Sequence, residues 1–525
     1  MSRLLPLALL AVACRTVPVT PTSALEALAA HPLSHLVGTP VELASPVVLN
    51  AEDFVYDARL SADAKSMAVA RLGMKGYFLS LFTLGTTPPT RRADTLINGY
   101  ELDVEMVEPS PDGSVFATVG RDGAVRVFDA TTGLARAAWL TDEPLVSLAI
   151  HPSGQWLVTG SAHGLITVLS FPGLNQVAEA RGHSDEVRGL AFAPDGRLFS
   201  AGWDKHVTRW SFIESGQPVL STRLHAEKKS GQPVFRAVLN GKVSVSTTID
   251  ARLPMPVVQA ALAQAAGIEV SALTESATLT TAFGQQLAKV AKGQRFSFKG
   301  LTFDSVDVAI CDACVPVGAQ AVLGASLLER FDFASDESTH EVMITAKPGS
   351  AATSAVAPEL KAEAVFTLEA YVNDLTIDAA GKTLGVALSG DKALRNREVY
   401  EREKRKEPAP FSEWDCGALL DAETGSLLSK HPVTGVVATA GISPDGQSLL
   451  TGGWNKEVSL WTRGSPTALS TERFGWAVRR VRFSRDARWA SVAAWTPQNP
   501  LGSHQSDPSA VFYEVVYGPN AVVAP

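Results

Sequence analysis

Apolar and polar residues alternate along most of the chain in short runs that are separated by turn signals. Residues 105–129 show the pattern clearly, with turns at 110–113 and 120–123 that separate apolar runs at 115–119 and 125–129. Alternation with a period of two, bounded by Gly, Pro, Asp and Ser, predicts β-strands joined by tight turns. The pattern therefore predicts an all-β chain.

This strand–turn unit recurs seven times. Most neighbouring copies of its first turn lie about 41 to 49 residues apart, which is the repeat length of a four-stranded propeller blade. Seven units predict a seven-bladed β-propeller. The seven first turns begin at Ser61, Ser110, Pro152, Ala193, Asp378, Ser443 and Ser484.

The fourth unit carries the most informative residues. His183 follows Gly182 before the first strand, Ser200 lies in the second strand, Asp204 in the next turn and Trp210 in the third strand. This set resembles the WD-repeat family, in which such residues form a hydrogen-bonded chain within a blade. The resemblance implies a structural role for the four residues. A Ser/His/Asp hydrolase is the alternative, but no nucleophile elbow accompanies the set.

A closed ring needs its first and last blades to be joined. Residues 46–50 supply a strand ahead of the first unit, and we expect this strand to complete the last blade and remove an exposed sheet edge. The sixth unit keeps Trp461 but has Asn455 where the fourth unit has Asp204.

The repeat is interrupted between the fourth and fifth units. About 140 residues are surplus there, enough for a small separate domain. We therefore expect propeller blades 1–4 over 41–225, an inserted domain over 226–350, and blades 5–7 over 351–525. A second, charged insertion over 390–413 predicts a solvated loop or short helix, with a docking role as the alternative.

The order of elements in the inserted domain is itself informative. Strands are expected over 234–239 and 243–250, a helix over 256–266 that ends at Gly267, a hairpin through 283–293, and an apolar segment over 321–328 before Phe331. This order resembles the retropepsin-like aspartic proteases. The resemblance implies a small, mainly β acid-protease fold whose catalytic triplet falls at Asp250.

The triplet itself departs from the Asp-Thr-Gly of that family, because it reads Asp250-Ala251-Arg252. Aspartic proteases need two carboxylates that share a proton, and retropepsins take the second from a second chain. An arginine within about 4–6 Å lowers the pKa of a carboxylate and disfavours that shared-proton state. We interpret the insert as catalytically inactive. An active aspartic endopeptidase, which would need the insert to homodimerise, is the alternative.

The N-terminus has the form of an export signal. Arg3 precedes an apolar run over 4–13, and Ala11, Val12 and Ala13 stand directly before Cys14. This resembles the lipobox of bacterial lipoproteins, which implies a signal peptide over 1–14 and a lipid on Cys14. Residues 15–40 are rich in Pro, Thr, Ala and Ser and predict a tether. An ordinary cleaved signal is the alternative, and no membrane-spanning helix is expected.

Composition narrows the partners. A net charge of −8 offers no basic excess to neutralise phosphates, which argues against a nucleic-acid partner. Four cysteines are too few for a disulfide scaffold. Cys311 and Cys314 are expected to form a local disulfide outside the cytoplasm, and Cys416 to be buried in a strand. No motif predicts a metal site or a cofactor.

Together these features predict a non-enzymatic scaffold, held to a membrane only through its lipid and located in the periplasm, at the outer membrane or on the cell surface. The propeller would bind a protein partner, and the insert would bind an extended peptide. The alternative function is an active retropepsin-like endopeptidase with a propeller that recruits substrates. A fold alone does not decide between them.

Overall fold

The computed structural model describes residues 35–49, 54–61, 63–73, 75–84, 89–98, 104–141, 143–213, 221–229, 232–281, 284–298, 301–336, 341–350, 358–390, 415–475, 477–494, 510–517 and 522–524. The signal peptide over 1–14 with Cys14, and nearly all of the charged segment over 390–413, lie outside these residues.

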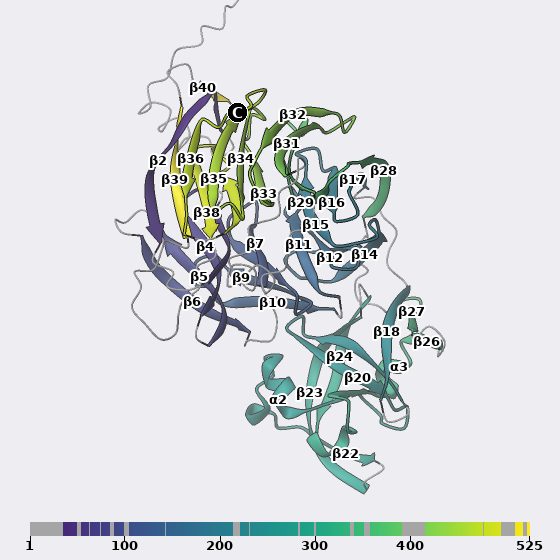
Figure 1. Cartoon of the computed structure of the whole chain (residues 1–525). Helices are drawn as coiled ribbons and strands as arrows, with labels where there is room; N and C mark the ends of the chain where they lie inside the picture. The colour runs from purple at the N-terminus through teal and green to yellow at the C-terminus, as the bar shows by residue number, and fades with distance from the viewer. Residues whose placement is uncertain are drawn as a thin grey trace, which may run out of the picture.

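Seven four-stranded antiparallel sheets form the larger part of the molecule (Figure 1). The first strands of the seven sheets contact one another in sequence, and the contact between the first and last of them closes the ring. This confirms the seven-bladed propeller.

The first three blades are β3 (Phe54–Leu60), β4 (Ser66–Gly73), β5 (Gly76–Thr83) and β6 (Thr90–Asn98); β7 (Val104–Pro109), β8 (Val115–Gly120), β9 (Ala124–Asp129) and β10 (Ala135–Leu140); and β11 (Leu145–Ile150), β12 (Trp156–Ser161), β13 (Leu165–Ser170) and β14 (Gln176–Arg181).

The other four are β15 (Val187–Phe192), β16 (Leu198–Gly202), β17 (His206–Ile213) and β28 (Glu359–Thr367); β29 (Tyr371–Ile377), β30 (Thr383–Ser389), β31 (Cys416–Asp421) and β32 (Leu427–Pro432); β33 (Val437–Ile442), β34 (Ser448–Gly453), β35 (Glu457–Thr462) and β36 (Ser470–Arg473); and β37 (Val478–Phe483), β38 (Trp489–Ala494), β39 (Ala510–Tyr517) and β2 (Pro40–Leu49).

The turn between the first two strands of a blade is built by its own side chains. In the second blade, the Ser110 hydroxyl donates to Asp112 at 2.6 Å and accepts from the Val115 amide at 3.1 Å. Gly113 closes the turn at a φ of +70°, a conformation that favours glycine. The Ser-Pro-Asp-Gly sequence thus specifies this turn, and it recurs with the same contacts at Ser443 in the sixth blade.

The N-terminal closing strand is longer than expected. β2 pairs with β39 from Pro40 to Leu49, which includes all of the expected strand except residue 50, outside the described part. β1 (His35–Val37) pairs in addition with β40 (Val522–Ala524). Residues 35–37 and 40 of the expected tether over 15–40 therefore take part in strand pairing, and residues 15–34 lie outside the described part.

The insertion lies inside the fourth blade. β17 pairs along its whole length with β28, and Ile213 lies opposite Glu359. The expected boundary at residue 226 falls within β18 (Ser221–Lys229), which pairs with strands of the insert, and the segment after 350 supplies β28 to blade 4 rather than starting blade 5. The spacing of the repeats did not reveal this arrangement, because the prediction took the four strands of each blade to be consecutive in the sequence.

We call residues 221–346 the guest domain. Its ten strands form one sheet, which lies beside the ring, and β20 contacts β10 of the second blade (Figure 1). Its elements are β18, β19 (Gln232–Leu239), β20 (Val243–Ile249), β21 (Val257–Val258), α2 (Ala260–Ala265), η1 (Val270–Ala272), β22 (Ser276–Thr281), β23 (Gly284–Phe298), β24 (Leu301–Ile310), η2 (Asp312–Cys314), β25 (Ala321–Leu323), α3 (Ala325–Leu328), β26 (Phe331–Asp336) and β27 (Glu341–Ala346).

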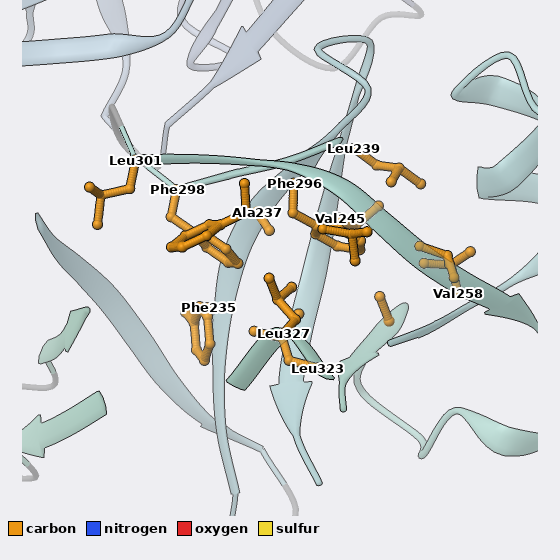
Figure 2. Close-up of a cluster of buried hydrophobic side chains, with 14 of the residues drawn as sticks. Phe235, Ala237, Leu239, Val245, Val258, Phe296, Phe298, Leu301, Leu323 and Leu327 are labelled. Carbon is orange, nitrogen blue, oxygen red and sulfur yellow. The ribbon is translucent and has the colours of Figure 1, made fainter. Parts of the chain in front are cut away.

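The guest domain has its own aromatic core (Figure 2). Phe235, Phe296 and Phe298 are at most 1% exposed and meet residues from α3 and the surrounding strands. The helix expected over 256–266 is shorter than predicted. Val257 and Val258 form β21 instead, because these β-branched residues pair with both β24 and β25.

Candidate functional site

The four residues singled out in the fourth blade are joined in one hydrogen-bonded chain. His183 contacts Asp204 through Nδ1 at 3.0 Å and the Ser200 hydroxyl through Nε2 at 2.7 Å. The Trp210 indole N–H donates to the same hydroxyl at 2.9 Å. Burial opposes ionisation of Asp204, but the bond from His183 and two backbone amides lower its pKa to about 2. The set connects β16 and β17 to the segment that precedes β15, and it leaves no open nucleophile, because the Ser200 side chain is fully buried.

The sixth blade keeps only part of this chain. The Trp461 indole N–H donates to the Thr451 hydroxyl at 2.8 Å, the counterpart of the bond between Trp210 and Ser200. Asn455 stands at the aspartate position and donates instead to Glu457 at 3.0 Å.

Each of the seven innermost strands has a register shift that skips one residue near its start. A bulge of this kind re-aims a side chain away from the regular pleat. Because the seven strands contact one another around the ring, the skipped residues form a circle at one end of its axis. They are Tyr56, Glu105, Val146, Arg188, Asn373, Ala438 and Arg479.

Three residues of this circle are charged: Glu105, Arg188 and Arg479. Together with Arg121 and Glu186, which contact them, they form what we call the rim cluster. Arg121 donates to Glu105 at 2.7 Å and to both oxygens of Glu186 at 3.0 and 3.2 Å. Among the described residues, the other two arginines contact these glutamates at longer distances, Arg188 to Glu186 at 3.4 Å and Arg479 to Glu105 at 3.5 Å. Burial alone would raise the pKa of Glu105, but the three arginines lower it to about 2.

A second group of charges lies on the same innermost strands. Arg482 grips both oxygens of Asp374 at 2.6 Å, and Arg480 contacts the same carboxylate at 3.1 Å. Arg59 contacts Asp57 at 3.2 Å and Glu108 at 3.4 Å. Burial would raise the pKa of Asp374, yet Arg482 and Arg480 hold it well below its ordinary value. These pairs link the seventh blade to the fifth and the first blade to the second.

The charged residues of the rim cluster and of this second group, which we together call the axis charges, were not predicted from the sequence. Their one signal is a charged residue inside an otherwise apolar first strand, as at Glu105 or Arg480. In a regular strand, successive side chains point to opposite faces of the sheet. The bulge that redirects a side chain cannot be recognised in the pattern of apolar and polar residues.

The guest domain places Asp250 at the end of β20. β20 runs parallel to β25, and the Asp250 amide donates to the Leu323 carbonyl at 3.1 Å. A Cβ on Gly324 would lie 2.2 Å from the Met255 carbonyl, so only glycine fits where the two loops cross. The loop carrying the degenerate triplet is therefore held against the segment at 323–324.

The triplet forms an internal ion pair. Arg252 donates to both Asp250 oxygens, through Nε at 2.8 Å and through a terminal nitrogen at 2.7 Å. The Arg252 amide adds a third bond at 3.0 Å. These bonds from Arg252 hold the pKa of Asp250 below its ordinary value. The Asp250 side chain is 24% exposed, and its two oxygens are engaged by its own loop rather than facing a second carboxylate.

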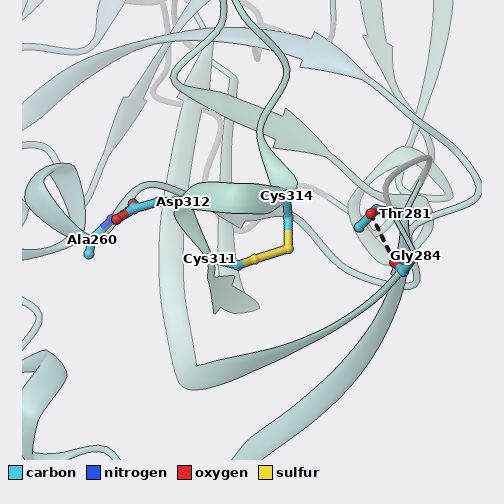
Figure 3. Close-up of a disulfide and its surroundings, with 6 residues drawn as sticks. All are labelled: Ala260, Thr281, Gly284, Cys311, Asp312 and Cys314. Carbon is cyan, nitrogen blue, oxygen red and sulfur yellow. Dashed lines mark hydrogen bonds between the residues drawn. A yellow bond between two sulfur atoms is a disulfide. The ribbon is translucent and has the colours of Figure 1, made fainter.

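Cys311 and Cys314 are joined in a disulfide beside η2 (Figure 3). Asp312 between them accepts from the Ala260 amide at 2.7 Å and so ties this loop to the start of α2. Cys416 is a free thiol, fully buried in β31, and burial raises its pKa to about 11.

The described residues contain neither a metal site nor a membrane-spanning helix. In that part of the chain, no cluster of three or more His, Cys, Asp or Glu side chains is arranged to hold a metal ion. Within the same residues, no helix combines the length and apolar character needed to cross a membrane.

Comparisons with known proteins agree with the propeller. Residues 95–129, 141–168, 174–211 and 423–462 match the WD domain, G-beta repeat (WD40). The chain is 29% identical over 167 residues to the guanine nucleotide-binding protein subunit beta of Solanum tuberosum, covering 29% of this chain and 44% of the relative. It is 33% identical over 128 residues to the ribosome biogenesis protein WDR12 homolog of Chlamydomonas reinhardtii, covering 24% and 26%. The chain thus spans less than half the length of these relatives. It contains WD40 repeats in a seven-bladed ring, an arrangement suited to protein interaction.

Proposed function

We propose that this WD40-repeat protein is a non-enzymatic interaction scaffold, exported and anchored by a lipid on Cys14. Its propeller binds a protein partner, and its guest domain binds an extended peptide. The relatives support the first part, because a guanine nucleotide-binding protein subunit beta is by its name one subunit of an assembly.

We further propose that the guest domain has a retropepsin-like fold that no longer cleaves peptides. The observation that carries this proposal is the ion pair inside the triplet, in which Arg252 engages both oxygens of Asp250. An aspartic protease needs a carboxylate that shares a proton with a second carboxylate across a water molecule. A salt-bridged Asp250 with a lowered pKa is a poor member of such a pair, whether or not two guest domains associate.

A peptidase assay tests this proposal. We expect the mature protein to cleave no member of a mixed peptide library between pH 3 and 7. Cleavage that Asp250→Ala abolishes would establish the alternative, an active endopeptidase with a substrate-recruiting propeller. Asp312→Ala is the matched control, because it removes a carboxylate from the same domain without touching the triplet.

Anchoring is tested separately. Fractionation of a bacterial host should place the wild-type protein in the membrane fraction outside the cytoplasm, with a lipid mass on the N-terminal Cys14. Cys14→Ser should release it from that fraction. A wild-type protein that is cleaved but carries no lipid would contradict the anchor and leave an ordinary signal peptide.

A further inference from the structure

The rim cluster has more cationic donors than its own carboxylates accept. Its three arginines and two glutamates sum to a formal charge of +1 in a chain whose net charge is −8. A guanidinium carries five N–H donors. Arg121 alone takes the short contacts to both glutamates, which leaves Arg188 and Arg479 with contacts of 3.4 and 3.5 Å.

In Arg188, the shortage of acceptors is visible at one nitrogen atom. Its Nε is buried, and no hydrogen-bond partner for it is found among the described residues. A buried donor without a partner costs free energy, typically about 1–3 kcal/mol, and an acceptor supplied by a ligand would recover that cost. The guanidinium lies over the Trp203 ring, 5.2 Å from its centroid, and this flat support fixes its orientation.

Arg479 is held in a similar way, 5.8 Å from the centroid of the Tyr56 ring. The exposed fractions of the charged side chains determine whether the surface at this end of the axis is cationic or anionic. The side chains of Arg121, Arg188 and Arg479 are 16%, 11% and 17% exposed, whereas those of Glu105 and Glu186 are 4% and 3% exposed. What reaches solvent at this end of the axis is therefore the cationic part of the cluster.

We infer that the rim cluster is a carboxylate-binding site, and that its occupant is an acidic segment of the protein partner. This inference rests on the proposed function and names the chemistry of the partner. Planar guanidiniums bind carboxylates in a bidentate manner, and Arg188 and Arg479 flank the Glu105–Arg121–Glu186 group so that two neighbouring acidic side chains can be bound.

A binding assay on the mature full-length protein tests the inference. The probe is a fluorescein-labelled peptide of alternating Glu and Gly, and binding is followed by fluorescence anisotropy. We expect saturable binding that weakens with added salt, and about tenfold weaker binding for each of Arg188→Gln and Arg479→Gln. The same peptide with Gln in place of Glu should not bind.

Arg473→Gln is the matched control, because Arg473 lies on β36, is 83% exposed and is also paired with a glutamate. It should leave binding unchanged. Equal losses in Arg473→Gln, equal binding of the Gln peptide, or no binding of the Glu peptide would each overturn the inference. Unchanged urea midpoints for Arg188→Gln and Arg479→Gln show that the variants fold.

A separate photocrosslinking experiment tests the proposed function. Photocrosslinkers at the propeller surface report whether any protein partner is bound. A crosslinked partner that still binds the double Arg188→Gln, Arg479→Gln variant leaves the scaffold intact and refutes the acidic-segment site. Absence of any propeller crosslink in the native host refutes the scaffold itself.

Discussion

Removing one hydroxyl at Ser200 tests how the fourth blade is held together. The Ser200 side chain is fully buried and touches two polar partners, the His183 ring at 2.7 Å and the Trp210 indole N–H at 2.9 Å. Ser200→Ala removes both contacts and leaves the two partners in place. Those rings are only 7% and 4% exposed, so water cannot readily replace the lost bonds.

The expected cost follows from these contacts. Leaving a buried polar group without a partner costs about 1–3 kcal/mol. Two such groups remain after Ser200→Ala, so we expect a loss of about 2–6 kcal/mol in the free energy of unfolding of the propeller. Thr451→Val is the matched comparison in the sixth blade, because its hydroxyl accepts only the Trp461 indole N–H. It should cost about 1–2 kcal/mol less than Ser200→Ala.

Urea unfolding followed by tryptophan fluorescence measures the effect. All ten tryptophans lie outside the guest domain, so none of them reports that domain directly. Because a chain with two cores need not unfold in one step, hydrogen exchange in β15 to β17 supplies a local reading. Equal losses for Ser200→Ala and Thr451→Val would refute the reasoning, because the His183 bond would then contribute nothing.

Four further predictions follow from the same structure. The pKa of Asp204 is lowered from 3.8 to about 2, so its contribution to stability is complete above pH 4 and is lost as the pH falls through about 2; Asp204→Asn should flatten acid unfolding monitored by fluorescence in that window. Arg252→Gln should raise the pKa of Asp250 toward its ordinary value, measured by carboxyl NMR titration. Leu49→Ala, at a 2% exposed position in the closing strand, should lower the free energy of unfolding by about 2–5 kcal/mol in urea. Cys416, whose buried thiol has its pKa raised to about 11, should react with iodoacetamide only after unfolding, as mass spectrometry would show.

The propeller could be predicted because the residues that specify its turns lie close together in the sequence. Each first turn is specified by residues within a few positions of one another, such as Ser110, Asp112 and Gly113. The set around His183 is also short in sequence, and its resemblance to the WD-repeat family implied the contact. The edges of the guest domain could not be placed in this way. The partner of β17 lies beyond the whole insertion, and strand pairing across such a distance leaves no periodic signal.

The axis charges fall in the same category. Arg482 and Asp374 are 108 residues apart, and Arg479 and Glu105 are 374 residues apart. The first pair needs three consecutive blades to pack against one another, and the second is brought together only when the ring closes. Sequence reasoning therefore found the residues that build a blade and missed those that join different blades.

The position of the guest domain has a consequence for the blade that carries it. Residues 214–358 separate β17 from β28, and closing a flexible loop of that length costs free energy that grows with the logarithm of its length. The guest domain reduces this cost through its own fold, because Ser221 pairs with Thr345 and brings its two ends together. The hydrogen-bonded set from His183 to Trp210 lies on β16, on β17, on the turn between them and on the segment that directly precedes β15. The first three strands are therefore locked without β28, so the fourth blade can form its inner part before the guest domain has folded and returned the outer strand.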